Sequence, residues 1–394
     1  MVVKSNKFIY SILLLLFLSL PHVLFIYYGY SLSIGLFIIS IFLYLMKFNN
    51  IEIKKNKLYF FILIFLYLFI QSLFFFFEDT KSFISVFLIF FIIFGLYLLS
   101  KKLNEKGIKV LDIIGIPLFF LIFFGWISII FPQVIPYPEK FEKFVFPFSE
   151  QSHYALCTGF LTIVYGFYKN NKIKFFLFLN LMLQAIIFPS LTLMQFCFFA
   201  FFIFFMIGNI YLYIISLIIL ITFFLLSTGF FLQDTDNYFV SRIMLKDTEN
   251  LSSLVYLQGI DDAKNALFST NGLGLGFQRA GTSEIGEYGK LILNSYNLVL
   301  NREDGGFLAA KIVIEFGLLG VFIVLSYASL FVKSLIKIIV SKKNTPIFNI
   351  ALIAFFIEFF FRGIGYFSPQ LLLLILIYFC GNIYFRDQTK GNDR

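Results

Sequence analysis

Ionisable side chains gather at one junction of the chain, where a long polar stretch runs into an apolar one. The segment Asn301-Arg-Glu-Asp-Gly-Gly-Phe307 is followed by Lys311 and Glu315 inside the apolar run. Asp304, Lys311 and Glu315 are separated by seven and four residues, a spacing that places them on one face of a helix. Ionisable groups inside apolar spans are costly and usually functional. This is the strongest candidate site, and a structural ion pair is the alternative interpretation.

A second candidate is Pro147-Phe-Ser-Glu-Gln-Ser-His-Tyr-Ala155, at the start of another apolar run. Glu150 and His153 share a face if a helix begins here, with Ser149 or Ser152 as its N-cap. A carboxylate near a medium of low dielectric has a raised pKa, which suits proton transfer. The alternative is an interfacial helix cap whose charged residues face water.

Arginine is the third candidate residue type, because its guanidinium binds phosphate or diphosphate through paired hydrogen bonds. The polar stretch contains Arg242, Arg279 and Arg302. Ordinary salt bridging within an acidic segment is the alternative interpretation of all three.

Two further patterns are weaker. The run Asn271-Gly-Leu-Gly-Leu-Gly-Phe277 allows a tight turn or a close backbone approach, but no βαβ unit surrounds it, so it is no dinucleotide fingerprint. Glu358 and Arg362 repeat a four-residue ion-pair spacing in a later apolar run. We interpret this second pair as structural.

The residue types that usually bind metals are scarce. Cys157, Cys197 and Cys380 all lie in apolar stretches, with a spacing unlike any metal motif. His22 and His153 are the only histidines of the chain. We therefore expect inert buried thiols, no metal site and no cofactor.

Composition identifies the elements that must position these residues. The chain is 60% hydrophobic and 13% charged, whereas soluble domains contain about 25% charged residues. Its apolar runs approach the length of membrane helices and lack the alternation of a membrane β-barrel. We predict an all-α, polytopic transmembrane helix bundle, with residues 1–394 forming a single integral membrane domain.

We expect about twelve spans, and loops outside the membrane at residues 133–152 and, much larger, at 233–306. The spans are predicted near residues 8–28, 31–46, 59–78, 81–100, 110–132, 153–168, 173–189, 191–207, 209–231, 307–332, 346–365 and 368–385.

Charge predicts the orientation of these spans. With both termini in the cytoplasm, the cytoplasmic segments hold 20 of the 31 basic residues, as the positive-inside rule requires. The large loop contains ten acidic and six basic residues, which suits the outer face. The excess of basic residues therefore faces anionic membrane lipid and gives no reason to expect nucleic acid.

Three segments resemble the O-antigen polymerase and ligase superfamily of bacterial membrane glycosyltransferases. Phe148-Ser-Glu-Gln-Ser-His-Tyr-Ala155 is similar to the Ser-Glu-Pro-Ser-His-Phe-Ala pattern of Wzy-type polymerases, with Gln151 in place of Pro. Leu267-Phe-Ser-Thr-Asn-Gly-Leu-Gly-Leu-Gly276 is similar to a segment of the family's large loop. Asp304 followed by Glu315-Phe-Gly-Leu-Leu-Gly320 is similar to the loop exit and the following helix.

Two comparisons with the family's patterns refine this resemblance. The family often has Leu-Thr-x-Ser-Arg after the seventh span, whereas Leu191-Thr-Leu-Met-Gln195 lacks the Ser and the Arg. The arginine of that pattern is therefore absent from this segment. Ligases typically carry a histidine in the large loop, and residues 232–306 contain none. The polymerase is therefore favoured over the ligase.

The resemblance implies a fold similar to the C-type membrane glycosyltransferases and a location in the bacterial inner membrane. It implies inverting, metal-independent transfer on the periplasmic face between two oligosaccharides linked to undecaprenyl diphosphate, with a chain-length regulator as a further protein partner. Within this scheme Glu150 is the candidate base, His153 orients it or contacts sugar, and Asp304 is the rival base. The residues assigned to substrate binding are Arg242, Arg279, Asn301, Arg302, Lys311 and Glu315.

Three other functions stay open. The resemblance also allows an O-antigen ligase that transfers glycan to the lipid A core. A flippase or transporter of lipid-linked oligosaccharide would use the same intramembrane charges to pass a polar head group. A structural assembly partner for chain-length control would need no intramembrane charge. The absence of a recognisable internal repeat disfavours a secondary transporter.

Overall fold

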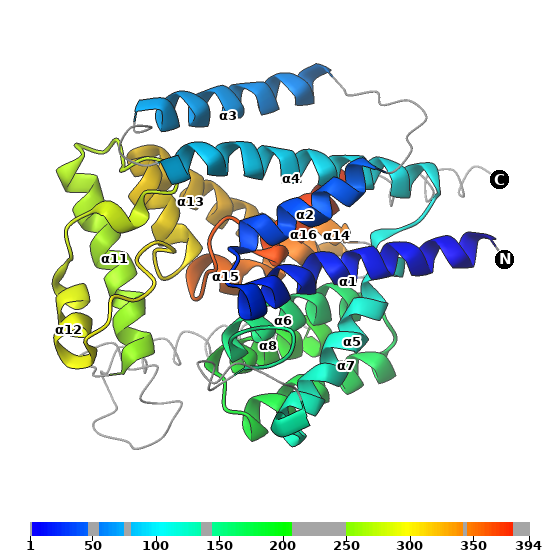
Figure 1. The fold of residues 1–394 in the computed structure, drawn as a ribbon. Helices are drawn as coiled ribbons and strands as arrows, with labels where there is room; N and C mark the ends of the chain where they lie inside the picture. The colour runs from blue at the N-terminus through cyan, green and yellow to red at the C-terminus, as the bar shows by residue number, and fades with distance from the viewer. Residues whose placement is uncertain are drawn as a thin grey trace. The chain divides into compact units, whose positions relative to one another are not determined.

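The computed structural model describes residues 2–45, 55–74, 80–134, 144–206, 250–341 and 345–380, and these residues are mainly helical (Figure 1). Four described helices are long and apolar enough to cross a membrane: Asn6–Tyr28, Thr80–Glu105, Val110–Ile130 and Leu308–Ser341. Within these ranges the single β-type pairing is an isolated bridge between Val145 and Phe148. The chain is thus a helical membrane protein, and the total of twelve spans stays a prediction.

The chain divides into two compact units. Unit 1 comprises residues 1–169, 344–355 and 366–394, and unit 2 comprises residues 170–343 and 356–365.

The helices of unit 1 pack through small residues. They are α1 (Val2–Tyr28), α2 (Leu32–Tyr44), α3 (Lys55–Phe74), α4 (Thr80–Glu105), α5 (Val110–Ile130), α6 (Gln151–Phe167), α14 (Ile347–Ala354) and α16 (Pro369–Cys380). A Cβ atom at Gly35 of α2 would lie 2.6 Å from the Cα atom of Pro21 in α1. Gly95 of α4 faces Ser40 of α2, where a Cβ atom would lie 3.4 Å from the Ser40 Cβ. Such contacts allow close helix approach where lipid provides little hydrophobic driving force.

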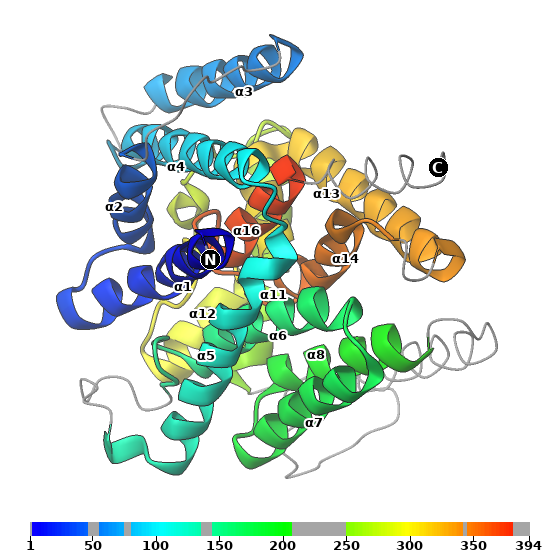
Figure 2. The same cartoon turned by 90° about the vertical axis from the view of Figure 1, so that its right-hand side faces the viewer.

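Unit 2 contains the described part of the predicted large loop. Its elements are α7 (Asn171–Ile187), α8 (Leu191–Phe201), a π-helical turn (Phe202–Met206), α11 (Leu251–Ser269), a 3-10 turn (Ala280–Thr282), α12 (Glu287–Tyr296), α13 (Leu308–Ser341) and α15 (Phe356–Phe360). Helices α7 and α8 lie side by side (Figure 2). Helix α11 packs against both α12 and α13, and Leu254, Val255 and Ile292 form a small core between α11 and α12.

Two predicted spans differ in detail from the helices. The span predicted at 307–332 extends to Ser341 and is broken at Gly317, whose φ of 57° and ψ of −128° are not helical. The span predicted at 346–365 is two short helices, which end at Ala354 and Phe360. The Arg362-Gly363-Ile364-Gly365 segment that follows α15 is not helical, because glycine favours such irregular backbone. The span predicted at 209–231 lies outside the described residues.

Candidate functional site

Lys311 is the centre of a charged cluster at the start of α13. Its ammonium group donates to the backbone carbonyl of Glu303 and to the side-chain oxygen of Gln278, the latter at 3.4 Å. It also lies 3.8 Å from a carboxylate oxygen of Asp304 and 3.5 Å from one of Glu315. The side chains of Lys311 and Glu315 are 1% and 0% exposed, whereas that of Asp304 is 47% exposed. The cluster therefore extends from the protein interior to a solvent-accessible carboxylate.

The three residues that the sequence placed on one helix face do come together, although Asp304 precedes the helix. Asp304 lies in the turn Asn301–Gly306, where Asn301, Gly305 and Gly306 have positive φ. A Cβ atom at Gly305 would lie 2.8 Å from the backbone nitrogen of Lys311. Glycine at this position lets the turn fold back onto α13, and this brings Asp304 to Lys311.

The break at Gly317 makes the start of α13 a short, separately held helix. Its residues from Leu308 to Phe316 are buried except for Val313, which is half-buried. A short buried segment of this kind keeps Lys311 and Glu315 at fixed positions. Discontinuous membrane helices of this type frequently carry binding sites, because the break frees backbone groups.

The glycine-rich run, residues 271–277, forms backbone hydrogen bonds with α13 on both sides of this break. The amides of Leu275 and Gly276 donate to the carbonyls of Ile314 and Glu315 at 2.9 and 3.0 Å, and the amide of Leu318 donates to the carbonyl of Gly272 at 2.8 Å. A Cβ atom at Gly274 would lie 2.5 Å from the carbonyl oxygen of Glu315. The run therefore makes the close backbone approach that its glycines allow, and its partner is the helix that carries the charged cluster.

Arg302 is held almost entirely by the protein itself. It is 8% exposed, and its Nε donates to Asp262 at 3.4 Å. Its two terminal nitrogens donate to the carbonyls of Gly281, Ser283 and Glu284 and to the hydroxyl of Ser283. These contacts favour a structural role in cross-linking the loop. A contact between Arg302 and substrate stays a prediction, as it does for the exposed turn residue Asn301.

Asp262 is the buried partner of Arg302 and lies on α11. Burial raises the pKa of its carboxyl group above the ordinary value, and the Arg302 guanidinium opposes this rise. Arg279 is half-buried and adjoins Gln278, the side chain that contacts Lys311. Arg242 lies outside the described residues.

The segment after α15 covers the turn before α13, a relationship that sequence reasoning missed. The amide of Gly363 donates to the carbonyl of Gly306 at 3.3 Å. A Cβ atom at Gly365 would lie 2.9 Å from a carboxylate oxygen of Asp304. The signal in the sequence is the pair of glycines that interrupts an apolar run just after Arg362. Glu358 of α15 is 2% exposed, and the structural interpretation of this span's charges stays a prediction.

In unit 1, the second candidate lies at the start of α6. Glu150 is the N-cap residue and makes no capping hydrogen bond through its side chain. The expectation that Ser149 or Ser152 caps this helix is therefore wrong, because the helix begins at Gln151, between the two serines. The hydroxyl of Ser152 instead donates to the carboxylate of Glu150 at 2.9 Å. Glu150 is exposed and His153 is half-buried in the first turn.

His22 of α1 lies beside this segment and was not recognised as a site residue. Its ring centroid lies 5.6 Å from that of His153 and 4.6 Å from that of Phe148. The His22 side chain is fully buried, and neither ring nitrogen has a hydrogen-bond partner among the described residues. The only two histidines of the sequence thus meet at the start of α6. The one signal for this in the sequence is the rarity of histidine itself.

Comparisons of the chain with protein-family models, with curated proteins and with solved structures find no match. The sites themselves therefore carry the functional argument. Unit 2 offers a buried cation flanked by two carboxylates. Unit 1 offers an exposed carboxylate at the start of α6, and two imidazoles that contact each other.

Proposed function

We propose that this protein polymerises oligosaccharide repeat units linked to undecaprenyl diphosphate, on the periplasmic face of a bacterial inner membrane. The product would be O-antigen or a similar surface polysaccharide. The acceptor hydroxyl of one lipid-linked unit attacks the anomeric carbon of the other. A new glycosidic bond forms with inversion, the bond to the diphosphate breaks, and the hydroxyl proton passes to a base.

One observation supports this proposal above the others. Two of the segments that resemble the polymerase and ligase superfamily, Leu267–Gly276 and Glu315–Gly320, are hydrogen-bonded to each other. Their contact includes the backbone of Glu315, whose carboxylate forms an ion pair with the buried Lys311. Segments far apart in sequence that resemble one family and also pack together are better explained by a shared site than by chance.

The chemistry of the leaving group fits the charges of unit 2. A departing diphosphate carries negative charge, which positioned cations stabilise. We assign Arg242 and Arg279 to the diphosphate, and Lys311 and Glu315 to the site that surrounds it. Asp304 is the exposed member of that cluster and is the rival base.

Glu150 remains our first candidate for the base that accepts the proton. Its carboxylate is exposed, as contact with an incoming sugar hydroxyl requires, and it directly precedes the helix turn that contains His153. His153 would orient the carboxylate or contact sugar.

Deletion of the gene, followed by electrophoresis of the surface glycan, tests the proposed reaction. Loss of the ladder with retention of a core carrying one repeat unit supports a polymerase. Polymer that accumulates on the lipid carrier, with none on the core, would indicate a ligase instead. A flippase is indicated if single-repeat products no longer reach the outer face.

Substitution then tests the proposed base. Glu150→Ala should abolish long chains while the protein remains at its normal abundance, because no residue would accept the proton. Glu287→Gln is a matched control, since Glu287 is an exposed acidic residue in the first turn of α12. Long chains in the Glu150→Ala strain would exclude Glu150 and turn attention to Asp304.

A further inference from the structure

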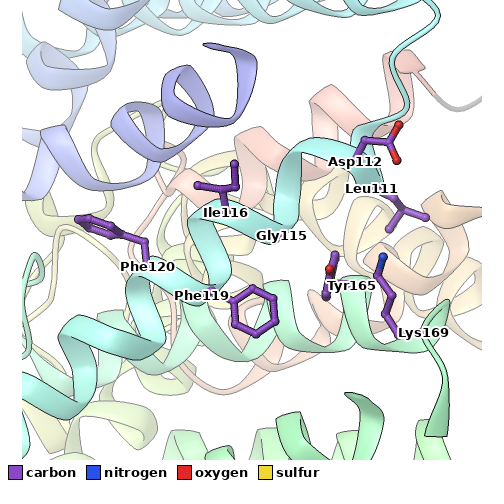
Figure 3. A pocket seen from close by; sticks show the side chains of 8 residues that line it. All are labelled: Leu111, Asp112, Gly115, Ile116, Phe119, Phe120, Tyr165 and Lys169. Atoms are coloured by element: carbon purple, nitrogen blue, oxygen red, sulfur yellow. The ribbon is translucent and has the colours of Figure 1, made fainter. Parts of the chain in front are cut away.

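A groove with a volume of 530 Å³ lies between α5 and α6 of unit 1 (Figure 3). Helix α5 lines it from Leu111 to Phe120, α6 contributes Tyr165, and Lys169 follows the end of α6. One end of the groove is polar and the other is apolar. None of its residues belongs to the sites described above.

The polar end has an excess of positive charge. The Lys169 ammonium lies 4.3 Å from the centre of the Tyr165 ring, and no carboxylate in the described part of the chain forms an ion pair with it. The one acidic residue of the lining, Asp112, is paired with Lys7 at 2.8 Å. Because Lys7 neutralises Asp112, Lys169 provides the net charge at this end.

The apolar end continues along α5. Ile116 and Phe119 are 40% and 41% exposed, and Phe123, one turn further, is 59% exposed. Gly115 keeps the groove open, since a Cβ atom there would lie 3.1 Å from the hydroxyl oxygen of Tyr165. A larger residue at position 115 would fill the space between the helices.

We infer that this groove binds an anionic phospholipid. A phosphate would accept hydrogen bonds from the Lys169 ammonium and the Tyr165 hydroxyl, and an acyl chain would lie along Ile116, Phe119 and Phe123. Free phosphate would leave the apolar wall unused, whereas an uncharged lipid would leave Lys169 unpaired. The polar end also belongs to the predicted cytoplasmic side, where anionic lipid attracts lysine. This inference is independent of the proposed function.

The test measures lipid retained by the purified full-length protein, using native mass spectrometry. Phosphatidylglycerol and diacylglycerol with identical acyl chains are the probes, because diacylglycerol lacks the phosphate that Lys169 and Tyr165 would bind. We expect preferential retention of phosphatidylglycerol, and about tenfold weaker retention in Lys169→Gln, the order expected for loss of one charge-assisted hydrogen bond. Gly115→Leu should exclude both lipids.

Two variants control for charge and folding. Lys172→Gln removes an exposed lysine from α7 and should leave retention unchanged, and Lys169→Arg should preserve it. If Gly115→Leu does not fold, the comparison of Lys169→Gln with Lys169→Arg decides the question. Equal retention of phosphatidylglycerol by the parent and by Lys169→Gln would overturn the inference. So would its displacement by an isoprenoid phosphate at equal concentration.

Discussion

The amide of Gly276 donates a 3.0 Å hydrogen bond to the carbonyl of Glu315. This bond joins a glycine-rich loop to a carbonyl next to the break in α13. The break lies two residues further on, at Gly317, so the loop supplies partners for backbone groups that a continuous helix would satisfy internally. The geometry of the buried Lys311–Glu315 pair thus depends on a loop more than thirty residues away in the sequence.

We expect Gly317→Ala to destabilise the protein by about 1–3 kcal/mol or more, because its φ of 57° and ψ of −128° suit glycine alone. A Cβ atom at this position would also clash with the carbonyl of Gly272. Thermal unfolding in detergent can be followed with a thiol-reactive dye, since Cys157, Cys197 and Cys380 are buried. Gly29→Ala is the control, because Gly29 has positive φ but no atom within 4 Å of the added Cβ. Equal midpoints for the parent and Gly317→Ala would contradict the strain argument.

Removal of the buried cation should have a larger effect. Lys311→Met leaves Glu315 without its ion-pair partner in the interior, and breaking a buried ion pair costs about 3–5 kcal/mol. The double variant Lys311→Met, Glu315→Gln removes both charges and should recover much of that loss. Unfolding midpoints of the parent, both single variants and the double variant measure this coupling.

Polymer synthesis by the double variant separates structure from function. If Lys311 serves the reaction, the double variant should be stable but inactive. A stable double variant that makes normal polymer would restrict the pair to a structural role.

The charged cluster could be predicted from the sequence, because the spacing of its residues along one segment was enough to show that they meet. Asp304, Lys311 and Glu315 lie close in sequence, so local geometry brings them together. The contact between Gly365 and Asp304 and the ring contact between His22 and His153 could not be predicted from the sequence, because both depend on tertiary packing. The helix break at Gly317 was also missed, since isolated glycines such as Gly317 and Gly320 are tolerated in an apolar run that predicts a continuous span.

The pH dependence of stability should reveal the Asp262–Arg302 pair. Burial raises the folded-state pKa of Asp262 above its ordinary value of 3.8. The protonated carboxyl group therefore favours the folded state. This contribution to the free energy of unfolding is fully present below pH 3.8 and is lost as the pH rises through the folded-state pKa. Arg302 opposes the rise in pKa, so Arg302→Met should raise it further and be more destabilising at about pH 7 than at about pH 3, which lies below the ordinary value.

Unfolding midpoints at the two pH values test this expectation. The double variant Arg302→Met, Asp262→Asn lacks the buried carboxylate and should lose the difference between them. If the effect of Arg302→Met is the same at both pH values, the carboxylate of Asp262 does not titrate as proposed.

The imidazole of His22 should be dispensable for folding but needed for full activity. Neither ring nitrogen has a hydrogen-bond partner among the described residues, and a buried polar group without a partner costs about 1–3 kcal/mol. His22→Phe keeps an aromatic ring against Phe148 and should therefore leave stability unchanged or raise it. If His22 positions His153 in the proposed reaction, the same variant should shorten the polymer ladder. The measurements are the unfolding midpoint and the chain-length distribution on a gel, with Tyr10→Phe as a control in the same helix. A normal ladder from His22→Phe would show that the contact between the two histidines is only a packing contact.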